Sequence, residues 1–585
     1  MVAAAVSSKS ERTQIDSEAE MGYATTRSLE RVAAAMGALE SAPVQFESAQ
    51  DVCHGGVLLA LPALLATGLL RFTQQFYALP KGFYGIDSIF LLLALMALAR
   101  IPSIEQLRYA APGEWGNLLG LDRVPEVKTL RTKLELLCRE AGRAVRWHTA
   151  LAREWMARQS SSELVFYADG HVRVYHGDLT PLPRHYVARE RLCMRATTDY
   201  WIHAMDGQPF FYVNKEVDPG LIATLRNDLV PFLENHAPLS PELQKRMEDN
   251  PRQHRFTLVF DREAYSPELF AEMQAKRIAV VTYHKYPGED WPAEEFSERT
   301  VELGGGDVVG MKLAERGTRL SNGLWVRQVR KLSAGGKQTA ILSTDYEADY
   351  TRLAASMFAR WSQENFFKYM REHYGLDRLV EYGTEAVPDS VRVVNPAWRQ
   401  LDSQVRTLTG KHQYLLVQFA AQSLQGEMSE AEVTGYQQRK AQLQEEIEHL
   451  GEQLGQIKQQ RKQTAHHVTV GELPEAERFS RLLPERKHFL DTIKLISYRA
   501  ETSMASLLRE SLSREDDTRA LLRQIYSTEA DLLPDADHKT LTVRLHHLTQ
   551  AAHDQALLRL CDELNATETI FPGTDLRLIY KLGSC

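Results

Sequence analysis

Three carboxylates in this 585-residue sequence have the chemistry of a divalent-metal site. Asp169 closes an apolar run that begins at Glu163, and Asp261 closes a second one that begins at His254. Short runs rich in β-branched and aromatic residues predict buried strands, where a carboxylate is costly unless a cation compensates it. With Glu364 they form a set of hard oxygen ligands that suits Mg²⁺, or Mn²⁺ in its place. A pair of such ions fits in-line phosphoryl transfer.

The third carboxylate lies in the segment 353–379, which predicts one helix. Arg360, Glu364 and Lys368 follow one another at i, i+4 spacing and therefore share one face. The residues that would hold this helix against a sheet are Phe358, Trp361, Phe366 and Phe367. The alternative interpretation of the charged stripe is a pair of intrahelical salt bridges, each worth about 0.2–0.5 kcal/mol.

A strand ending in Asp, a second strand ending in Asp and a helix bearing Glu resemble the pattern of RNase H-like DDE transposases from bacterial insertion sequences. The resemblance spans roughly residues 50–585 and is carried by the stretches 169–175, 260–270, 313–317, 360–379 and 565–580. A related signature, Tyr-x2-Arg-x3-Glu-x6-Lys, has its Arg and Glu here as Arg360 and Glu364. Met357 stands in place of its Tyr, and Arg371 in place of its final Lys.

This resemblance implies that Asp169, Asp261 and Glu364 are catalytic and hold two Mg²⁺ ions. It also implies contacts from Arg360, Lys368 and Arg371 to DNA phosphates. The expected function is a DNA transposase that binds insertion-sequence ends, cleaves a strand and transfers the 3′-hydroxyl into target DNA. The expected partner is double-stranded DNA, at the transposon ends and at the target, bound by a homodimer. The expected location is the cytoplasm of a bacterium, at the nucleoid.

The elements that must position these residues predict an α+β multidomain protein whose core is an RNase H-like mixed sheet. The expected divisions are a flexible N-terminus 1–45, a helical DNA-binding domain 46–158, a catalytic core 159–284 and 338–385, a β-rich insertion 285–337, a helical region with a short coiled coil 386–470, and a helical and small α/β unit 471–585.

Composition is that of an ordinary globular protein, with 44% hydrophobic and 25% charged residues. The net charge of −8 argues weakly against a DNA-binding protein, but 69 basic residues suffice for a local basic channel. The five cysteines are scattered without a CxxC pair, which favours a reducing compartment and no structural zinc. The apolar runs Gly55–Leu70 and Ile89–Ala99 are shorter than the ~20 residues that span a bilayer, so they predict buried helices and no membrane partner.

Two further segments carry candidate DNA-binding residues. Residues 101–138 predict three short helices, the last bearing Lys128, Arg131 and Lys133. They fit helix-turn-helix DNA binding and, equally, a bundle packed on the core. In the β-rich insertion, Arg327 and Arg330 could contact DNA, with a charged edge strand as the alternative.

Beyond the core, a heptad pattern is formed by Leu443, Ile447, Leu450, Leu454 and Ile457. Because it is short, we expect a hairpin within one chain that packs on the segment from Phe489 to Leu507, rather than a dimeric coiled coil. Near the predicted metal site, Asp206 is interpreted as a turn residue. Glu263 is interpreted as a solvated loop charge.

Two other classes of function remain open. An RNase H-like nuclease would cut DNA without joining strands, and only a strand-joining assay separates it from a transposase. A domesticated, inactive DNA-binding protein is the other class. The complete Asp, Asp, Glu set argues against it, because a binding module does not need three buried carboxylates.

Overall fold

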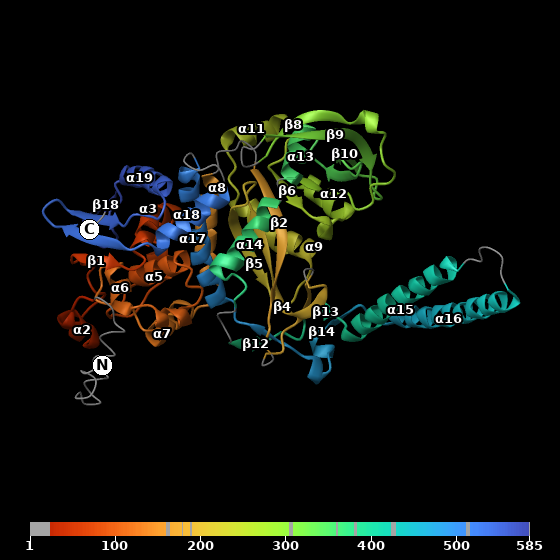
Figure 1. Cartoon of the computed structure of the whole chain (residues 1–585), viewed down its shortest axis with the longest axis horizontal. Helices are drawn as coiled ribbons and strands as arrows, with labels where there is room; N and C mark the ends of the chain where they lie inside the picture. Colours follow the sequence, from red (N-terminus) through yellow and green to blue (C-terminus); the bar gives the residue numbers. More distant parts are fainter. Residues whose placement is uncertain are drawn as a thin grey trace.

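The computed structural model describes residues 24–158, 164–177, 180–187, 190–303, 308–358, 361–378, 383–422, 429–509 and 515–583 (Figure 1). Its centre is a ten-stranded mixed sheet. The strands are β2 (Leu164–Val174), β3 (Arg184–Val187), β4 (Leu192–His203), β5 (Pro209–Lys215), β6 (Phe256–Phe260), β7 (Ile278–Tyr283), β8 (Ser297–Glu302), β9 (Val308–Arg319), β10 (Trp325–Leu332) and β11 (Gln338–Ser343).

The middle of this sheet has the spatial order β5-β4-β2-β6-β7. Strands β2, β4 and β5 form an antiparallel meander, whereas β6 lies parallel to β2, and β7 parallel to β6. The β2–β6 ladder pairs Leu164 with Phe256 and continues to Tyr167 with Val259. This register places residues 169 and 261 at the same level of the sheet.

Helices cover both faces of the central strands. One face, which carries Phe256 and Leu258, packs on α12 (Pro267–Ala275) and on the segment of α9 (Leu221–Thr224) and α10 (Val230–His236). The opposite face packs on α13 (Tyr350–Phe358) and α14 (Trp361–Tyr374). The segment predicted as one helix is therefore described as two, and residues 359–360 between them lie outside the described part.

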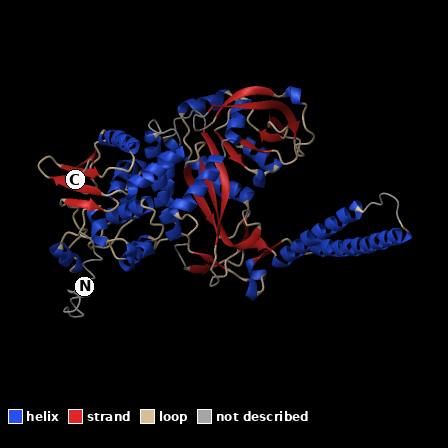
Figure 2. Cartoon of the chain, in the orientation of Figure 1, coloured by secondary structure: helices blue, strands red, loops and turns tan. Residues whose placement is uncertain are grey.

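The segment 285–337 extends the central sheet. Strand β11 pairs antiparallel with β7, and β10, β9 and β8 follow as successive antiparallel neighbours. Figure 2 shows these strands at the upper right, where they curve beside helices. The curved end packs on α13 through Met311 and Leu313 against Ala354 and Ala355.

The two ends of the chain share one hydrophobic core. Strand β1 (Ala49–Val52) pairs with β16 (Ala530–Asp535), which continues into β17 (Thr540–Leu545) and β18 (Arg577–Leu582). The helices around this core are α3 (Leu61–Thr67), α4 (Thr73–Phe76), α5 (Ile86–Leu98), α6 (Pro112–Asn117), α7 (Val127–Leu137), α8 (Arg143–Ala157), α17 (Glu485–Leu508), α18 (Glu515–Ser527) and α19 (Ala551–Asn565). Strands β1 and β18 accordingly lie on the same side in Figure 1.

Residues 24–45 were expected to belong to a flexible N-terminus, but in the structure they are folded against the helical body. This stretch contains α2 (Ser28–Ala35), and Arg27 donates hydrogen bonds to the carbonyls of Pro43, Gln45 and Gly120. Arg31 pairs with Asp122 at 2.6 Å. Two anchored arginines hold the segment against the helical body, an arrangement that its Ala- and Ser-rich sequence did not indicate.

The heptad segment lies in α16 (Glu430–Gln463), which pairs with α15 (Pro396–Ala421) in a hairpin that projects from the body (Figure 1). Leu454 is its buried heptad residue. The expected packing against α17 is wrong, because Phe489, Ile493 and Ile496 already pack on the N-terminal helices. At the base of the hairpin, two small ladders join β12 (Thr384–Ala386) to β15 (Ser480–Leu482) and β13 (Arg392–Val394) to β14 (His467–Thr469).

The two apolar N-terminal runs form buried elements of the shared core, including α3 and nearly all of α5. Within the described ranges, no helix is both long and apolar enough to cross a bilayer.

Candidate active site

Asp169 and Asp261 lie side by side on neighbouring parallel strands. Each follows the last pair of the β2–β6 ladder, Tyr167 with Val259, by two residues. Asp261 directly follows β6, as the sequence predicts. Asp169 does not end its strand: it pairs with Trp201 in the middle of β2, because β2 continues to Val174 as the partner of β4.

Both aspartates face α13 and α14. Side chains two residues apart on a strand share a face, so Asp169 lies on the side of Tyr167, whose hydroxyl donates to the carbonyl of Ser356 in α13. Trp201, the cross-strand neighbour of Asp169, contacts Phe366 and Phe367 of α14 with ring centroids 5.5 and 5.8 Å apart. The site therefore lies between the central strands and these two helices.

Glu364 belongs to the first turns of α14. Phe366 and Phe367, two and three residues later, lie against Trp201 of β4. Phe367 also stacks on His171 of β2 with ring centroids 4.7 Å apart, so the helix passes above the strand that carries Asp169. The Glu364 side chain lies outside the described part of the structure, as does the whole of Arg360. The structure thus brings the helix to the two aspartates, while the contact of its carboxylate stays a prediction.

A buried ionic cluster fixes α14 against α17. Tyr369 and Tyr374 of α14 donate hydrogen bonds to Glu501, which also pairs with Arg100 at 2.6 Å and with Arg519 at 3.3 Å. Burial by itself would raise the pKa of Glu501, but the two arginines and the two tyrosines hold it below its usual value. The carboxylate is therefore ionised and orients α14.

Two more carboxylates surround the aspartate pair. The backbone N–H of Glu263 donates to Asp261 at 2.8 Å, and the Glu263 carboxylate accepts from the N–H of Leu221 at 3.2 Å. Although part of this side chain reaches solvent, burial raises the pKa of Glu263 to about 7, and the charges of Asp261, Asp218 and Asp169 add to the rise. Glu263 is exposed, as expected of a loop charge, but it also lies near the other carboxylates of the site.

The sequence interpretation missed Asp218, which accepts a hydrogen bond of 2.5 Å from the hydroxyl of Tyr200. It follows β5, and β5 runs in the same direction as β2 because both are antiparallel to β4. The sequence did contain a signal for this residue: a carboxylate three residues after the end of β5, a third strand with the direction of β2 and β6. Asp206, in contrast, lies in the β4–β5 turn and accepts from the backbone of Gln208, as predicted.

The oxygen donors around Asp169 and Asp261 are of the kind that Mg²⁺ or Mn²⁺ selects. Among the described residues, the one group of three potential ligands whose donor atoms lie close together is Asp51, Asp531 and His546. There, the Asp531 carboxylate already accepts two hydrogen bonds from Arg544. That group is accordingly explained as an ion-pair network between β1, β16 and β17.

The predicted DNA-binding cations differ in exposure. Lys368 and Arg371 are exposed on α14, and Lys128 is exposed on α7. Arg131 is exposed but forms two hydrogen bonds with Glu105. Burial lowers the pKa of the half-buried Lys133.

The two arginines of the insertion have structural partners. Arg327 pairs with Glu315 and donates to the carbonyls of Asp345 and Ala348. Arg330 is 2% exposed, donates to the carbonyls of Pro287 and Glu289, and lies over the ring of Trp291. Because its guanidinium is enclosed, Arg330 cannot reach DNA in this conformation. This corrects its assignment as a DNA contact.

Comparison with known proteins gives two findings. A family model described as "Transposase protein" matches residues 22–584. The cryo-EM structure of a piggyBac transposase synaptic complex with hairpin DNA aligns with 82% of this chain and 83% of its own, at 11% identity and a TM-score of 0.25. A TM-score this low carries no argument about fold or function. Among curated proteins, none matches the sequence.

Proposed function

Because this chain belongs to the family of transposase proteins, we propose that it is a DDE transposase, which cleaves a DNA strand and joins the 3′-hydroxyl to target DNA. The observation that carries the proposal is the register of the β2–β6 ladder, which sets Asp169 beside Asp261 on the face that α14 covers. Glu364 on that helix supplies the third carboxylate.

The strand order supports an RNase H-like core. Three antiparallel strands are followed in the chain by two strands parallel to the first, in the spatial order β5-β4-β2-β6-β7. Helical segments separate β5 from β6, and α12 separates β6 from β7. This β-β-β-α-β-α-β sequence is the one that an RNase H-like sheet requires.

The residues present fit a site for divalent cations. Adjacent carboxylates repel one another, and that repulsion contributes to the raised pKa of Glu263. In the proposal, Asp169, Asp261 and Glu364 hold two Mg²⁺ ions, with Mn²⁺ as a substitute. When bound, such ions make water a nucleophile near neutral pH and neutralise charge on the phosphoryl group.

The chain's own groups orient this site. The N–H of Gly170 donates to Asp169 at 2.9 Å and the N–H of Glu263 donates to Asp261, so one oxygen of each carboxylate is held in place. Lys368 follows Glu364 by four residues on α14, and Arg371 follows Lys368 by three. Lys368 and Arg371 therefore form one exposed stripe. In the proposal this stripe binds DNA phosphates beside the scissile bond.

The proposed partner is double-stranded DNA, at the element ends and at the target, bound by a homodimer. An insertion sequence in the cytoplasm of a bacterium is the proposed setting. Lys128 on α7 belongs to the proposed interface because it is exposed. Arg330 does not, because it is buried.

The test uses the full-length protein with DNA that carries the flanking end sequences and Mg²⁺. Asp169→Asn, Asp261→Asn and Glu364→Gln each keep the shape of the side chain but remove a charged ligand. Each should lower cleavage by at least about a thousandfold. Asp206→Asn, in a turn outside the site, is the matched control and should keep its activity. Wild-type activity in all three variants would refute the mechanism, and cleavage without joined product would favour the nuclease.

A further inference from the structure

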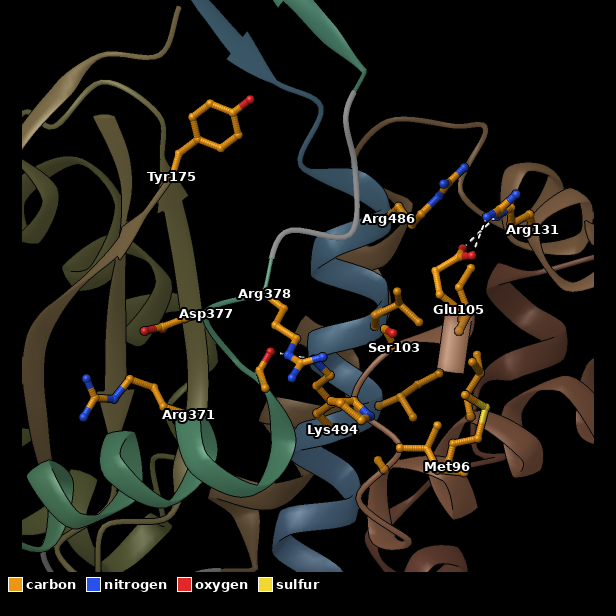
Figure 3. Close-up of a pocket in the computed structure, with 18 of the residues that line it drawn as sticks. Met96, Ser103, Glu105, Arg131, Tyr175, Arg371, Asp377, Arg378, Arg486 and Lys494 are labelled. Carbon is orange, nitrogen blue, oxygen red and sulfur yellow. Dashed lines mark hydrogen bonds and ion pairs between the residues drawn. The ribbon is translucent and has the colours of Figure 1, made fainter. Parts of the chain in front are cut away.

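A cleft of about 1150 Å³ opens beside the proposed active site (Figure 3). One wall is formed by the end of α5, the loop that follows it and α7. The other is formed by residues 174–177 after β2 and 375–378 after α14, and α17 forms the floor. The cleft therefore lies between the shared terminal core and the catalytic sheet.

The lining combines an apolar floor with a cationic rim. Apolar side chains at its base include Leu93, Met96, Ile104, Leu490 and Ile493. The lining also carries five cations, Arg131, Arg371, Arg378, Arg486 and the buried Lys494 of α17, against only two carboxylates, Glu105 and Asp377.

Both carboxylates are already engaged. Glu105 accepts two hydrogen bonds from Arg131, and Asp377 accepts one of 2.6 Å from His171. Within the described ranges, neither Arg371 nor Arg378 has an ion-pair partner, and both are exposed. The cleft thus presents positive charge that the protein itself does not neutralise.

Two elements connect the cleft to the carboxylate site. On α14, Arg371 follows Glu364 by seven residues, about 10 Å along a helix. On β2, Val174 follows Asp169 by five residues, roughly 17 Å along a strand. A strand of DNA held at the aspartates could therefore continue into the cleft.

We propose that this cleft binds a short single-stranded DNA segment that continues from the strand held at Asp169 and Asp261, an inference that rests on the proposed function. Phosphates lie on Arg371 and Arg378, and unpaired bases lie on the apolar floor, with Tyr175 on the wall for stacking. Cationic grooves with apolar and aromatic surfaces are suited to such strands.

Size and lining favour this occupant over two others. The volume exceeds the about 300–1,000 Å³ of typical small-molecule sites. A duplex stacks its base faces inside the helix, so it would gain nothing from an apolar floor. An unpaired strand exposes both its phosphates and its base faces, and therefore uses both features of the cleft.

The first experiment measures binding of the full-length protein to a fluorescent oligothymidylate of about eight nucleotides, and to a blunt duplex, without divalent cations. Arg378→Glu should weaken binding of the single strand about tenfold or more and lower its salt slope by about 0.7 per lost contact. Lys337→Glu, the same charge change in the exposed β10–β11 turn, is the control and should leave the affinity within about threefold of wild type.

A second variant blocks the cleft without changing its charge. Ser103 lines the wall and makes no side-chain capping bond, so replacing it should not unfold the protein. Ser103→Trp should abolish most binding of the single strand while the melting temperature stays near that of wild type. Wild-type binding by both Arg378→Glu and Ser103→Trp would overturn the proposal.

Two further outcomes would also overturn it. Equal losses of duplex and single-strand binding in Arg378→Glu would indicate general electrostatic attraction. Competition by thymidine monophosphate as strong as that by the oligonucleotide would indicate a small-molecule site.

Because Asp169→Asn should retain strand binding, this proposal can fail separately from the proposed function. Active amide variants would refute the mechanism. Unchanged strand binding in the cleft variants would refute the proposal that the cleft binds single-stranded DNA.

Discussion

Asp169 and Asp261 are 92 positions apart in the chain, and a single ladder register brings them together. A shift of the register by one residue would turn one of the two carboxylates to the opposite face of the sheet. Single positions also decide the role of the two arginines of the insertion. Both Arg327 and Arg330 donate to backbone carbonyls, and these contacts make both side chains structural. Burial at a single position therefore decides whether a charge is available for DNA.

The first residue-scale prediction concerns Glu263, whose folded-state pKa of about 7 lies above the ordinary value of 4.5. Between these values the folded protein holds a proton that the unfolded chain releases, so stability falls as the pH rises through this window. Without divalent cations, Glu263→Gln should therefore melt like wild type near pH 4.5 and at a higher temperature than wild type at pH 8. Scanning calorimetry at both pH values measures this difference.

The control for this prediction is Glu294→Gln, at an exposed carboxylate away from the site. It should melt within about 1 °C of wild type at both pH values. A Glu263→Gln curve that matches wild type at pH 8 would show that the neighbouring carboxylates do not strain this group.

At the scale of elements, α14 depends on α17 for its position. Glu501 is fully buried, and its four partners come from the segment after α5, from α14 and from α18. Through this enclosed carboxylate, α17 thus connects the N-terminal helices to the proposed catalytic helix. Such a cluster specifies one orientation of α14, because any other would leave charges without partners.

The second prediction tests this cluster. Glu501→Gln preserves the shape of the side chain but leaves Arg100 and Arg519 buried without a counter-charge. It should lower the free energy of unfolding by about 3–5 kcal/mol, measured by denaturant titration. Glu372→Gln, on the exposed face of α14, should change it by less than about 0.5 kcal/mol. Equal effects of the two substitutions would contradict the role of Glu501.

The third prediction concerns the projecting hairpin. Leu454 is its buried heptad residue and faces α15 within the same chain, so Leu454→Asp should destabilise the hairpin by ~2 kcal/mol or more without changing the oligomeric mass. Limited proteolysis and light scattering measure the two effects. The control is Val417→Asp, at a position 67% exposed on α15. Conversion of a dimer into a folded monomer by Leu454→Asp would show that the seam joins two chains.

At the scale of the whole molecule, the terminal segments form one folding unit. Strand β1 pairs with β16, and Tyr580 donates a hydrogen bond of 2.9 Å to the carbonyl of Leu58. The buried core of residues 46–158 is continuous with that of α17 and of the C-terminal sheet. The ten-stranded sheet and the projecting hairpin are inserted between these two halves (Figure 1).

The fourth prediction follows from this shared core. An isolated 46–158 fragment exposes the apolar surface that α17 and β16 cover, so it should lack a cooperative thermal transition by circular dichroism. Full-length protein should show one. A cooperatively folded fragment would contradict the shared core. DNA binding by α7 is therefore tested in the full chain, where Lys128→Glu should weaken duplex binding if the helix contacts phosphates, and leave it unchanged if α7 only packs.

The sequence by itself determined the order and type of most elements, because the local periodicities of strands and helices survive folding. It also predicted the strand positions of Asp169 and Asp261 to within the length of β2, and the turn that holds Asp206. Tertiary structure alone decided three further features: the enclosure of Arg330, the gathering of Asp218 and Glu263 beside the aspartates, and the common core of the chain's two ends. Each of these depends on pairings between residues far apart in the chain, such as Ala49 with Leu532, and local patterns carry no information about such pairings.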